Sequence, residues 1–169
     1  MLKINDSVMH RTSGVCRVKA IREDDLGAGR QQYYVLEPTY DKGMTIYIPT
    51  SKEHDQLRRL LTAREIKSLI ENVSGQENVW ISDDRKRRQY YRDVLKSDDP
   101  QKLICLISTL YQKKNEREKE GKKFYAEDQG IMEEAEKILH GEIAFVMDIE
   151  PDEVVSYIGS VLGGEKAKA

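Results

Sequence analysis

The spacing of apolar residues changes along this chain, and the change falls near Pro49. Before Pro49, apolar and polar residues alternate, as in Cys16, Val18 and Ala20, which is the period of a strand with one buried face. Turn-forming residues at 13–14, 24–29 and 40–43 separate segments rich in β-branched and aromatic residues. The expected strands are Ser7–Met9, Val15–Arg22, Gln31–Leu36 and Met44–Ile48. Several short strands in so few residues predict a small SH3-like or Tudor-like β-barrel.

After Pro49 the apolar residues recur with the period of amphipathic helices. Thr62–Glu65 has the pattern of a capping box, and a helix with Ile66, Leu69 and Ile70 on one face should follow it. The break at 74–78 predicts a linker. Further helices are expected to begin at Ser82, at Asp99–Pro100 and at Glu150–Pro151, another should hold residues 131–146, and Gly163–Gly164 should end the last one.

These patterns predict an α+β protein with two domains, which 169 residues are enough to build. The predicted divisions are a β-barrel over 1–61, a connecting helix over 62–73, a linker over 74–79, an all-α helical bundle over 80–164 and a tail over 165–169. The net charge of -2 conceals an asymmetry. Residues 80–125 hold 13 Lys and Arg against 8 Asp and Glu, whereas residues 126–169 hold 3 against 11. A basic middle beside an acidic end favours one surface that faces a polyanion.

Several function classes have no support in the sequence. Two cysteines, Cys16 and Cys105, are too few for a disulfide framework or a zinc knuckle. The opening residues contain no apolar signal stretch and no apolar run is long enough to span a membrane, so we expect a cytosolic, reduced protein. The sequence lacks a glycine-rich phosphate loop and a nucleophile elbow, and its three histidines are isolated. We therefore expect no catalytic residue, no metal, no cofactor and no small-molecule substrate.

Trp80 is the single tryptophan, and it precedes a helix start and four consecutive basic residues. Cations that hold phosphates beside a ring that wedges at a base step would suit DNA binding. At about 100° per residue, Arg85, Arg88, Arg92 and Lys96 form one stripe on this helix, while Tyr90 and Val94 point to the other side, where we expect the buried face. The predicted DNA-binding residues are Trp80, Arg85, Lys86, Arg87, Arg88, Arg92 and Lys96. A solvated surface helix and a packing role for Trp80 are the alternatives.

Five segments resemble the CarD/CdnL-like regulators that bind bacterial RNA polymerase. They are Ile4–Met9, Ser13–Val15, Tyr33–Leu36, Met44–Pro49 and Ile138–Ala144, and their order and spacing cover nearly the whole chain. The resemblance implies a Tudor-like N-terminal domain that docks on the polymerase β subunit. It also implies a helical domain that contacts promoter DNA at the upstream edge of the transcription bubble and stabilises the open complex, with a Trp as the wedge. Such a protein would associate with the nucleoid through the polymerase.

The resemblance locates the predicted polymerase-binding residues in the fourth strand: Met44, Thr45, Ile46, Tyr47 and Ile48. Some family members carry a basic residue where this chain has Tyr47, and the usual Trp position aligns with Asp84, four residues after Trp80. The sequence thus predicts a non-enzymatic transcription regulator that joins polymerase to promoter DNA. The alternative is a protein–protein adaptor, in which the basic helix binds an acidic partner and Trp80 holds the two domains together.

Overall fold

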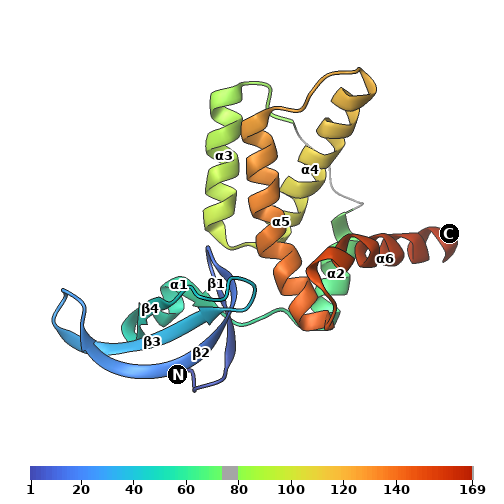
Figure 1. The fold of residues 1–169 in the computed structure, drawn as a ribbon. Helices are drawn as coiled ribbons and strands as arrows, with labels where there is room; N and C mark the ends of the chain where they lie inside the picture. Colours follow the sequence, from blue (N-terminus) through green and yellow to red (C-terminus); the bar gives the residue numbers. More distant parts are fainter. Residues whose placement is uncertain (74–79, 169) are drawn as a thin grey trace. The chain divides into compact units, whose positions relative to one another are not determined.

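The computed structural model describes residues 1–73 and 80–168 (Figure 1). It divides the chain into two compact units, Met1–Leu61 and Thr62–Ala169. The first unit contains the strands and the second is helical. The predicted linker at 74–79 lies outside the described residues.

The N-terminal unit is built on one antiparallel sheet of five strands in the order β4-β3-β2-β1-β5. The strands are β1 (Ser7–His10), β2 (Gly14–Asp25), β3 (Arg30–Pro38), β4 (Ile46–Pro49) and β5 (Leu57–Arg58). The two edge strands, β4 and β5, are not hydrogen-bonded to each other, so this sheet is open, whereas the sequence predicted a closed barrel. The physical reason is length, because β5 has only two residues and offers few backbone groups for a ladder.

The sequence placed β1, β2 and β3 within a few residues of their observed bounds. It placed the start of β4 too early, since Met44 and Thr45 precede the strand. Sequence analysis did not identify β5, nor the 3-10 turn η1 (Thr50–Lys52) and the single-turn helix α1 (Glu53–Gln56) before it. Segments this short show no measurable period, so the pattern of apolar residues carries no signal for them.

The core of this unit draws on every strand. It contains Val8, Cys16, Val18, Tyr34, Leu36, Ile48 and Leu57. Tyr34 lies opposite Ile48 in the β3–β4 ladder, and Val35 lies opposite Tyr47. Because neighbouring side chains of a strand point to opposite faces, Ile46 and Ile48 pack toward this core and Tyr47 points to the other face. The Tyr34 hydroxyl donates to Glu53 Oε2 at 2.6 Å, which ties α1 to the sheet.

The second unit consists of α2 (Ala63–Val73), α3 (Asp84–Ser97), α4 (Pro100–Lys119), α5 (Ala126–Met147), η2 (Pro151–Glu153) and α6 (Val154–Lys168). The predicted capping box is present, since the Thr62 amide donates to Glu65 Oε2 and the Glu65 amide donates to Thr62 Oγ1. Asp83 caps α3 and Asp99 caps α4, each by accepting a backbone N–H with its carboxylate. The cap of α3 is therefore one residue later than the predicted Ser82.

The helices of this unit share one apolar interior. α4 packs against α5, α3 packs against both of them, and α2 packs against α4 and α6 (Figure 1). The segment predicted to connect two domains is therefore part of the helical unit. The predicted end at Gly163 is wrong, because α6 continues to Lys168. A glycine ends a helix when it turns to positive φ, and Gly163 does not.

Candidate protein-binding edge and nucleic-acid interface

The β4 edge is the first candidate surface. Among the described residues, β4 pairs with β3 on one side only, so its other side presents unpaired backbone groups. Of the five residues predicted here, Met44, Thr45 and Tyr47 are exposed. Ile46 is half-buried against the core, and Ile48 is a core residue at 3% exposure. The accessible part of the predicted docking strand is thus the backbone edge with three of the five side chains.

Arg22 of β2 lies beside Tyr47 across the sheet. Its Nη2 donates to the Tyr47 hydroxyl at 3.0 Å, and its guanidinium carbon lies 5.7 Å from the centre of the Tyr47 ring. These contacts fix an exposed aromatic side chain next to the open edge. Sequence analysis did not identify Arg22, because the contact joins residues on two strands that are 25 positions apart in sequence.

The basic helix α3 is the second candidate surface, but one of its predicted DNA contacts is wrong. Arg87 is 0% exposed. Its Nε and Nη2 donate to the two oxygens of the buried Asp128 at 3.2 and 2.8 Å, and its Nη1 donates to Asp84 and to the carbonyl of Ile81. Two parallel hydrogen bonds to one carboxylate are the strongest geometry for this ion pair. Arg87 therefore holds the helical unit together and is too deeply buried to contact a phosphate.

The pKa values around this ion pair reflect its hydrogen bonds. Burial lowers the pKa of Arg87, but the hydrogen bonds to Asp128 and Asp84 outweigh burial and raise it above its ordinary value. The hydrogen bond from Arg87 lowers the pKa of Asp84. Both shifts favour the charged forms of Arg87 and Asp84 at neutral pH.

The buried face of α3 differs from the prediction. Tyr90 is 51% exposed, whereas Tyr91 at 2% and Leu95 at 7% are buried together with Val94 and Arg87. The buried face is centred near Tyr91 because the Arg87–Asp128 pair turns that side of the helix toward α5. The Tyr91 hydroxyl is buried and makes no hydrogen bond within the described part of the chain.

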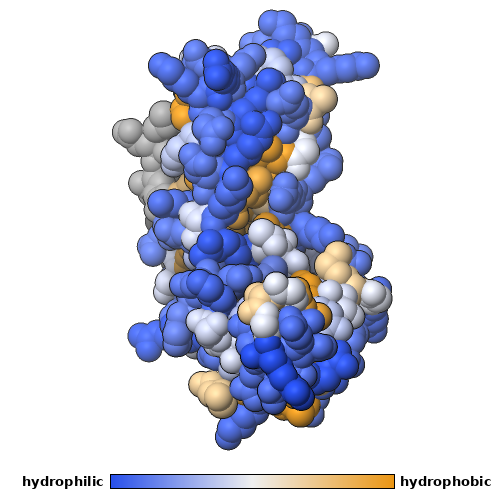
Figure 2. All heavy atoms as spheres, turned by 90° about the vertical axis from the view of Figure 1, so that its left-hand side faces the viewer, coloured by the Kyte–Doolittle hydropathy of each residue, from blue (hydrophilic) through white to orange (hydrophobic). Residues whose placement is uncertain are grey.

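Two members of the predicted basic stripe already have an acidic partner. Glu127 Oε2 lies 3.2 Å from Arg88 Nε and 3.8 Å from Arg92 Nη2. Arg85, Lys86 and Lys96 are exposed, and none of them forms an ion pair with the residues at 1–73 or 80–168. In Figure 2, which faces the side of the helical unit that carries α3, hydrophilic side chains cover most of the surface. The stripe is therefore in part free and in part neutralised by Glu127.

Trp80 packs within the helical unit. Its ring stacks on Tyr125 with centroids 6.1 Å apart, and the Arg87 guanidinium lies 4.1 Å from the ring centre. Lys113 Nζ lies 5.2 Å from the same ring. The ring is half-buried, between the deep burial of a core Trp and the full exposure of a free wedge. All these partners belong to the unit of Thr62–Ala169, so these contacts of Trp80 stabilise that unit.

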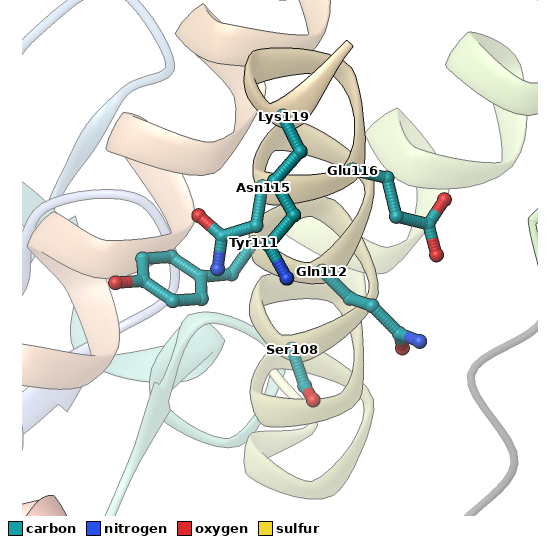
Figure 3. A pocket seen from close by; sticks show the side chains of 6 residues that line it. All are labelled: Ser108, Tyr111, Gln112, Asn115, Glu116 and Lys119. Atoms are coloured by element: carbon teal, nitrogen blue, oxygen red, sulfur yellow. The ribbon is translucent and has the colours of Figure 1, made fainter.

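The hollows recorded on the helical unit are shallow. The hollow in Figure 3 is lined by Ser108, Tyr111, Gln112, Asn115, Glu116 and Lys119. All six side chains come from α4, so this is an open helix surface. No three His, Cys, Asp or Glu residues of the described ranges gather as metal ligands. None of the helices there combines the length and apolar character that a membrane span requires.

His10 and the Cys16 thiol are buried, and His140 is partly buried. Burial lowers the pKa of His10 and His140, which keeps both neutral at pH 7, and the Nδ1 of His10 accepts the Ser13 amide in the β1–β2 turn. Burial also raises the pKa of the Cys16 thiol to about 12. A thiol this reluctant to ionise is a poor nucleophile.

Sequence analysis missed Glu127, Asp128 and Tyr125, which complete the arrangement around α3. Glu127 and Asp128 lie in the first turn of α5, where carboxylates are expected for the helix dipole alone. No local pattern connects them to arginines about 40 positions earlier. A weak signal was the sign change at residue 126, where the basic middle gives way to the acidic end.

Comparisons with known proteins agree with the motifs in the sequence. Residues 2–61 match the model of the CarD-like/TRCF RID domain. A Bacillus subtilis (strain 168) protein named "Putative transcription factor YdeB" is 23% identical over 158 residues, which are 93% of this chain and 99% of that protein. The match over residues 2–61 confirms the resemblance to CarD-like proteins that the sequence motifs indicated.

Proposed function

We propose that this protein is a transcription regulator that docks on the β subunit of bacterial RNA polymerase and contacts promoter DNA beside the transcription bubble. The match of residues 2–61 to the CarD-like/TRCF RID domain carries the proposal. The similarity to a protein named as a transcription factor extends across the helical unit as well. In this proposal the five-stranded sheet is a Tudor-like docking module, and the helical unit stabilises the open complex.

The open edge of β4 supports the docking step. A strand of the partner can pair with an exposed edge, and the backbone hydrogen bonds then supply affinity while neighbouring side chains supply specificity. β4 has such an edge, and the exposed Met44, Thr45 and Tyr47 lie along it or directly before it. Ile46 and Ile48 contribute by fixing the strand on its core.

The exposed basic residues of α3 support the proposed contact with DNA. Arg85, Lys86 and Lys96 can bind phosphates directly, and Arg88 and Arg92 can do so when they leave Glu127. Arg87 takes no part, because it is buried. The exposed part of the Trp80 ring lies just before this helix, where it can meet the groove while its stacked part keeps it oriented.

The docking step is tested by the double variant Met44→Ala with Tyr47→Ala. Loss of two exposed anchors should weaken binding of the full chain to bacterial RNA polymerase about 10-fold or more, with an unchanged circular dichroism spectrum. Leu26→Ala is the matched control, because Leu26 is also an exposed apolar residue of this unit but lies between β2 and β3, away from the β4 edge. Equal polymerase affinity for the double variant and the parent would refute docking through β4.

The DNA step is tested by the pair Arg85→Gln with Lys96→Gln. We expect the slope of log affinity against log salt to fall by about 2, since each lost phosphate contact removes about 0.9. Lys102→Gln with Lys137→Gln removes the same charge from exposed positions on α4 and α5 and should leave the slope unchanged. If both pairs change the slope equally, the effect is one of net charge and not of contact with the stripe.

The wedge is tested by the lifetime of the open promoter complex, measured well below the melting temperature. Trp80→Ala should shorten this lifetime, and Trp80→Phe should shorten it less because a ring remains at the position. A folded Trp80→Ala protein that gives the same decay rate as the parent would remove Trp80 from the proposal.

An adaptor without DNA contact is the second candidate function. It is favoured by one observation, namely that Arg88 and Arg92 already bind a carboxylate. In that case the Arg85 and Lys96 variants should lose affinity for an acidic protein partner, and the parent should show no salt-dependent affinity for duplex DNA.

A further inference from the structure

Glu127 lies beside two arginines of the basic stripe on α3. One of its oxygens, Oε2, is shared by Arg88 Nε at 3.2 Å and Arg92 Nη2 at 3.8 Å. Arg88 and Arg92 are one helical turn apart on α3, and Glu127 reaches them from the first turn of α5. A single anionic oxygen between two guanidinium groups is the arrangement that a phosphodiester oxygen takes with arginines.

The contact is exposed on the side of Glu127 and Arg92, whereas Arg88 Nε is buried and makes no hydrogen bond within the described part of the chain. The side chains of Glu127 and Arg92 are 58% and 54% exposed, and that of Arg88 is 23% exposed. Ion pairs at such exposure contribute little to stability, because water and salt screen them. The neighbouring Asp128 differs, because it is fully buried and accepts two hydrogen bonds from Arg87, with Arg88 Nη2 3.9 Å from its Oδ2. Of the two adjacent carboxylates, Asp128 thus holds the fold, and Glu127 is free to give way to another anion.

We propose that Glu127 is a tethered competitor of DNA phosphates for Arg88 and Arg92, which sets how strongly the α3 stripe binds nucleic acid. This inference rests on the proposed function. With Glu127 in place, the three side chains carry one net positive charge. When a phosphate displaces Glu127, both arginines become available to DNA. The carboxylate therefore weakens binding to free duplex DNA. DNA that is held close to α3, as on a docked polymerase, can displace it and contact the full stripe.

The test removes the charge of Glu127 and keeps its shape. Glu127→Gln in the full chain should bind a short mixed-sequence DNA duplex about 3- to 10-fold more tightly at low salt, the factor that loss of an exposed competing ion pair allows. The slope of log affinity against log salt, measured between about 0.05 and 0.2 M, should steepen by about 1 to 2 as the freed arginines bind phosphates. Melting temperature is measured beside affinity to confirm that each variant is folded.

Glu134→Gln is the matched control. Glu134 is exposed on the same helix, and at about 100° per residue it lies on the same face as Glu127, about 10 Å further along the axis. It changes the net charge equally without touching the arginines, so affinity and slope should stay close to those of the parent. Equal effects of Glu127→Gln and Glu134→Gln would overturn the proposal.

A second background separates this inference from the proposed function. In a protein that carries Arg88→Gln and Arg92→Gln, the gain from Glu127→Gln should disappear, and a gain that persists there overturns the competitor role. If the parent binds DNA but Glu127→Gln brings no gain, only this inference fails. If no variant shows salt-dependent DNA binding, the DNA step of the proposed function fails with it. A gain seen toward a glutamate-rich peptide but not toward DNA also overturns the proposal, and assigns the arginines to an acidic protein.

Discussion

Arg87 and Asp128 form a fully buried ion pair between α3 and α5. Removing one partner leaves a buried charge with no water to solvate it. The free-energy cost of that charge is much larger than the net stabilisation that the intact pair contributes. Trp80 and Tyr125 cover this guanidinium, with ring centres 4.1 and 5.4 Å from its carbon. In the basic segment Arg85–Arg88, Arg87 is therefore a structural charge, and the charges available at the surface belong to its neighbours.

We predict that Asp128→Ala lowers the free energy of unfolding of the helical unit by about 3–5 kcal/mol. The neighbouring Glu127→Ala, which removes an exposed carboxylate, should cost less than about 1 kcal/mol. Urea denaturation followed by circular dichroism measures both. The joint replacement of Arg87 by Met and Asp128 by Leu should recover most of the loss, since no buried charge is then left unpaired. Similar losses for the Asp128 and Glu127 variants would contradict a structural role for the buried pair.

Tyr91 provides a second prediction for a single residue. Its buried hydroxyl has no hydrogen-bond partner among the described residues, so Tyr91→Phe should leave stability unchanged or raise it by about 1 kcal/mol. Burial also raises the pKa of Tyr91 from 10.0 to about 12. Between these pH values the folded state keeps a proton that the unfolded state loses, so stability falls as pH rises.

The parent should therefore lose stability relative to Tyr91→Phe as pH increases from 10 to 12. Urea unfolding of the two proteins at a series of pH values checks this sign. A constant difference in free energy of unfolding across that range would show that the phenol does not stay protonated in the folded state.

Secondary-structure elements were predictable to the extent that their ends carry local chemistry. The caps at Thr62 and Asp99 involve partners two or three residues away, so the sequence alone located the starts of α2 and α4. The buried face of α3 was predicted less well. A helical projection that treats every arginine as exposed places the apolar side near Val94, whereas burial of Arg87 moves it toward Tyr91 and Leu95.

At the scale of elements, the capping box gives a direct test. Thr62→Ala should destabilise the helical unit by about 1 kcal/mol, because the Glu65 amide loses its acceptor. Thr62→Ser keeps the hydroxyl and should cost less than about 0.5 kcal/mol. The difference between the two variants in urea midpoint measures the cap. Equal midpoints for the alanine and serine proteins would mean that the cap contributes nothing.

At the scale of the whole molecule, the chain forms two units with a boundary between Leu61 and Thr62. The first has a core that draws on all five strands, and the second buries α2 against α4 and α6. We predict that fragments 1–61 and 62–169 each unfold cooperatively when produced separately. Thermal scans of the fragments and the full chain check this. If fragment 80–169 unfolds cooperatively and fragment 62–169 does not, α2 is not part of the helical unit.

The match of residues 2–61 confirms the resemblance of the motifs to CarD-like proteins, which the sequence alone could indicate because turns and strands are local features. The closed barrel was not confirmed, since closure depends on hydrogen bonds between the first and last strands of the sheet. Such pairing is set by strand length and bending in three dimensions, and a two-residue β5 leaves no trace in the sequence pattern.

The sequence by itself determined which segments form most of the strands and helices, which segment is basic, and that Trp80 adjoins the basic helix. These properties depend on neighbours within about one helical turn or on alternation along one strand. Only the tertiary structure decided which of the cations are free. Arg87 became a core residue and Arg88 and Arg92 became partners of Glu127 because α5 brings its first turn against α3, across 41 positions of sequence in the case of Asp128. A charge in a sequence has no assigned partner until the chain folds, and its partner determines whether it can bind anything else.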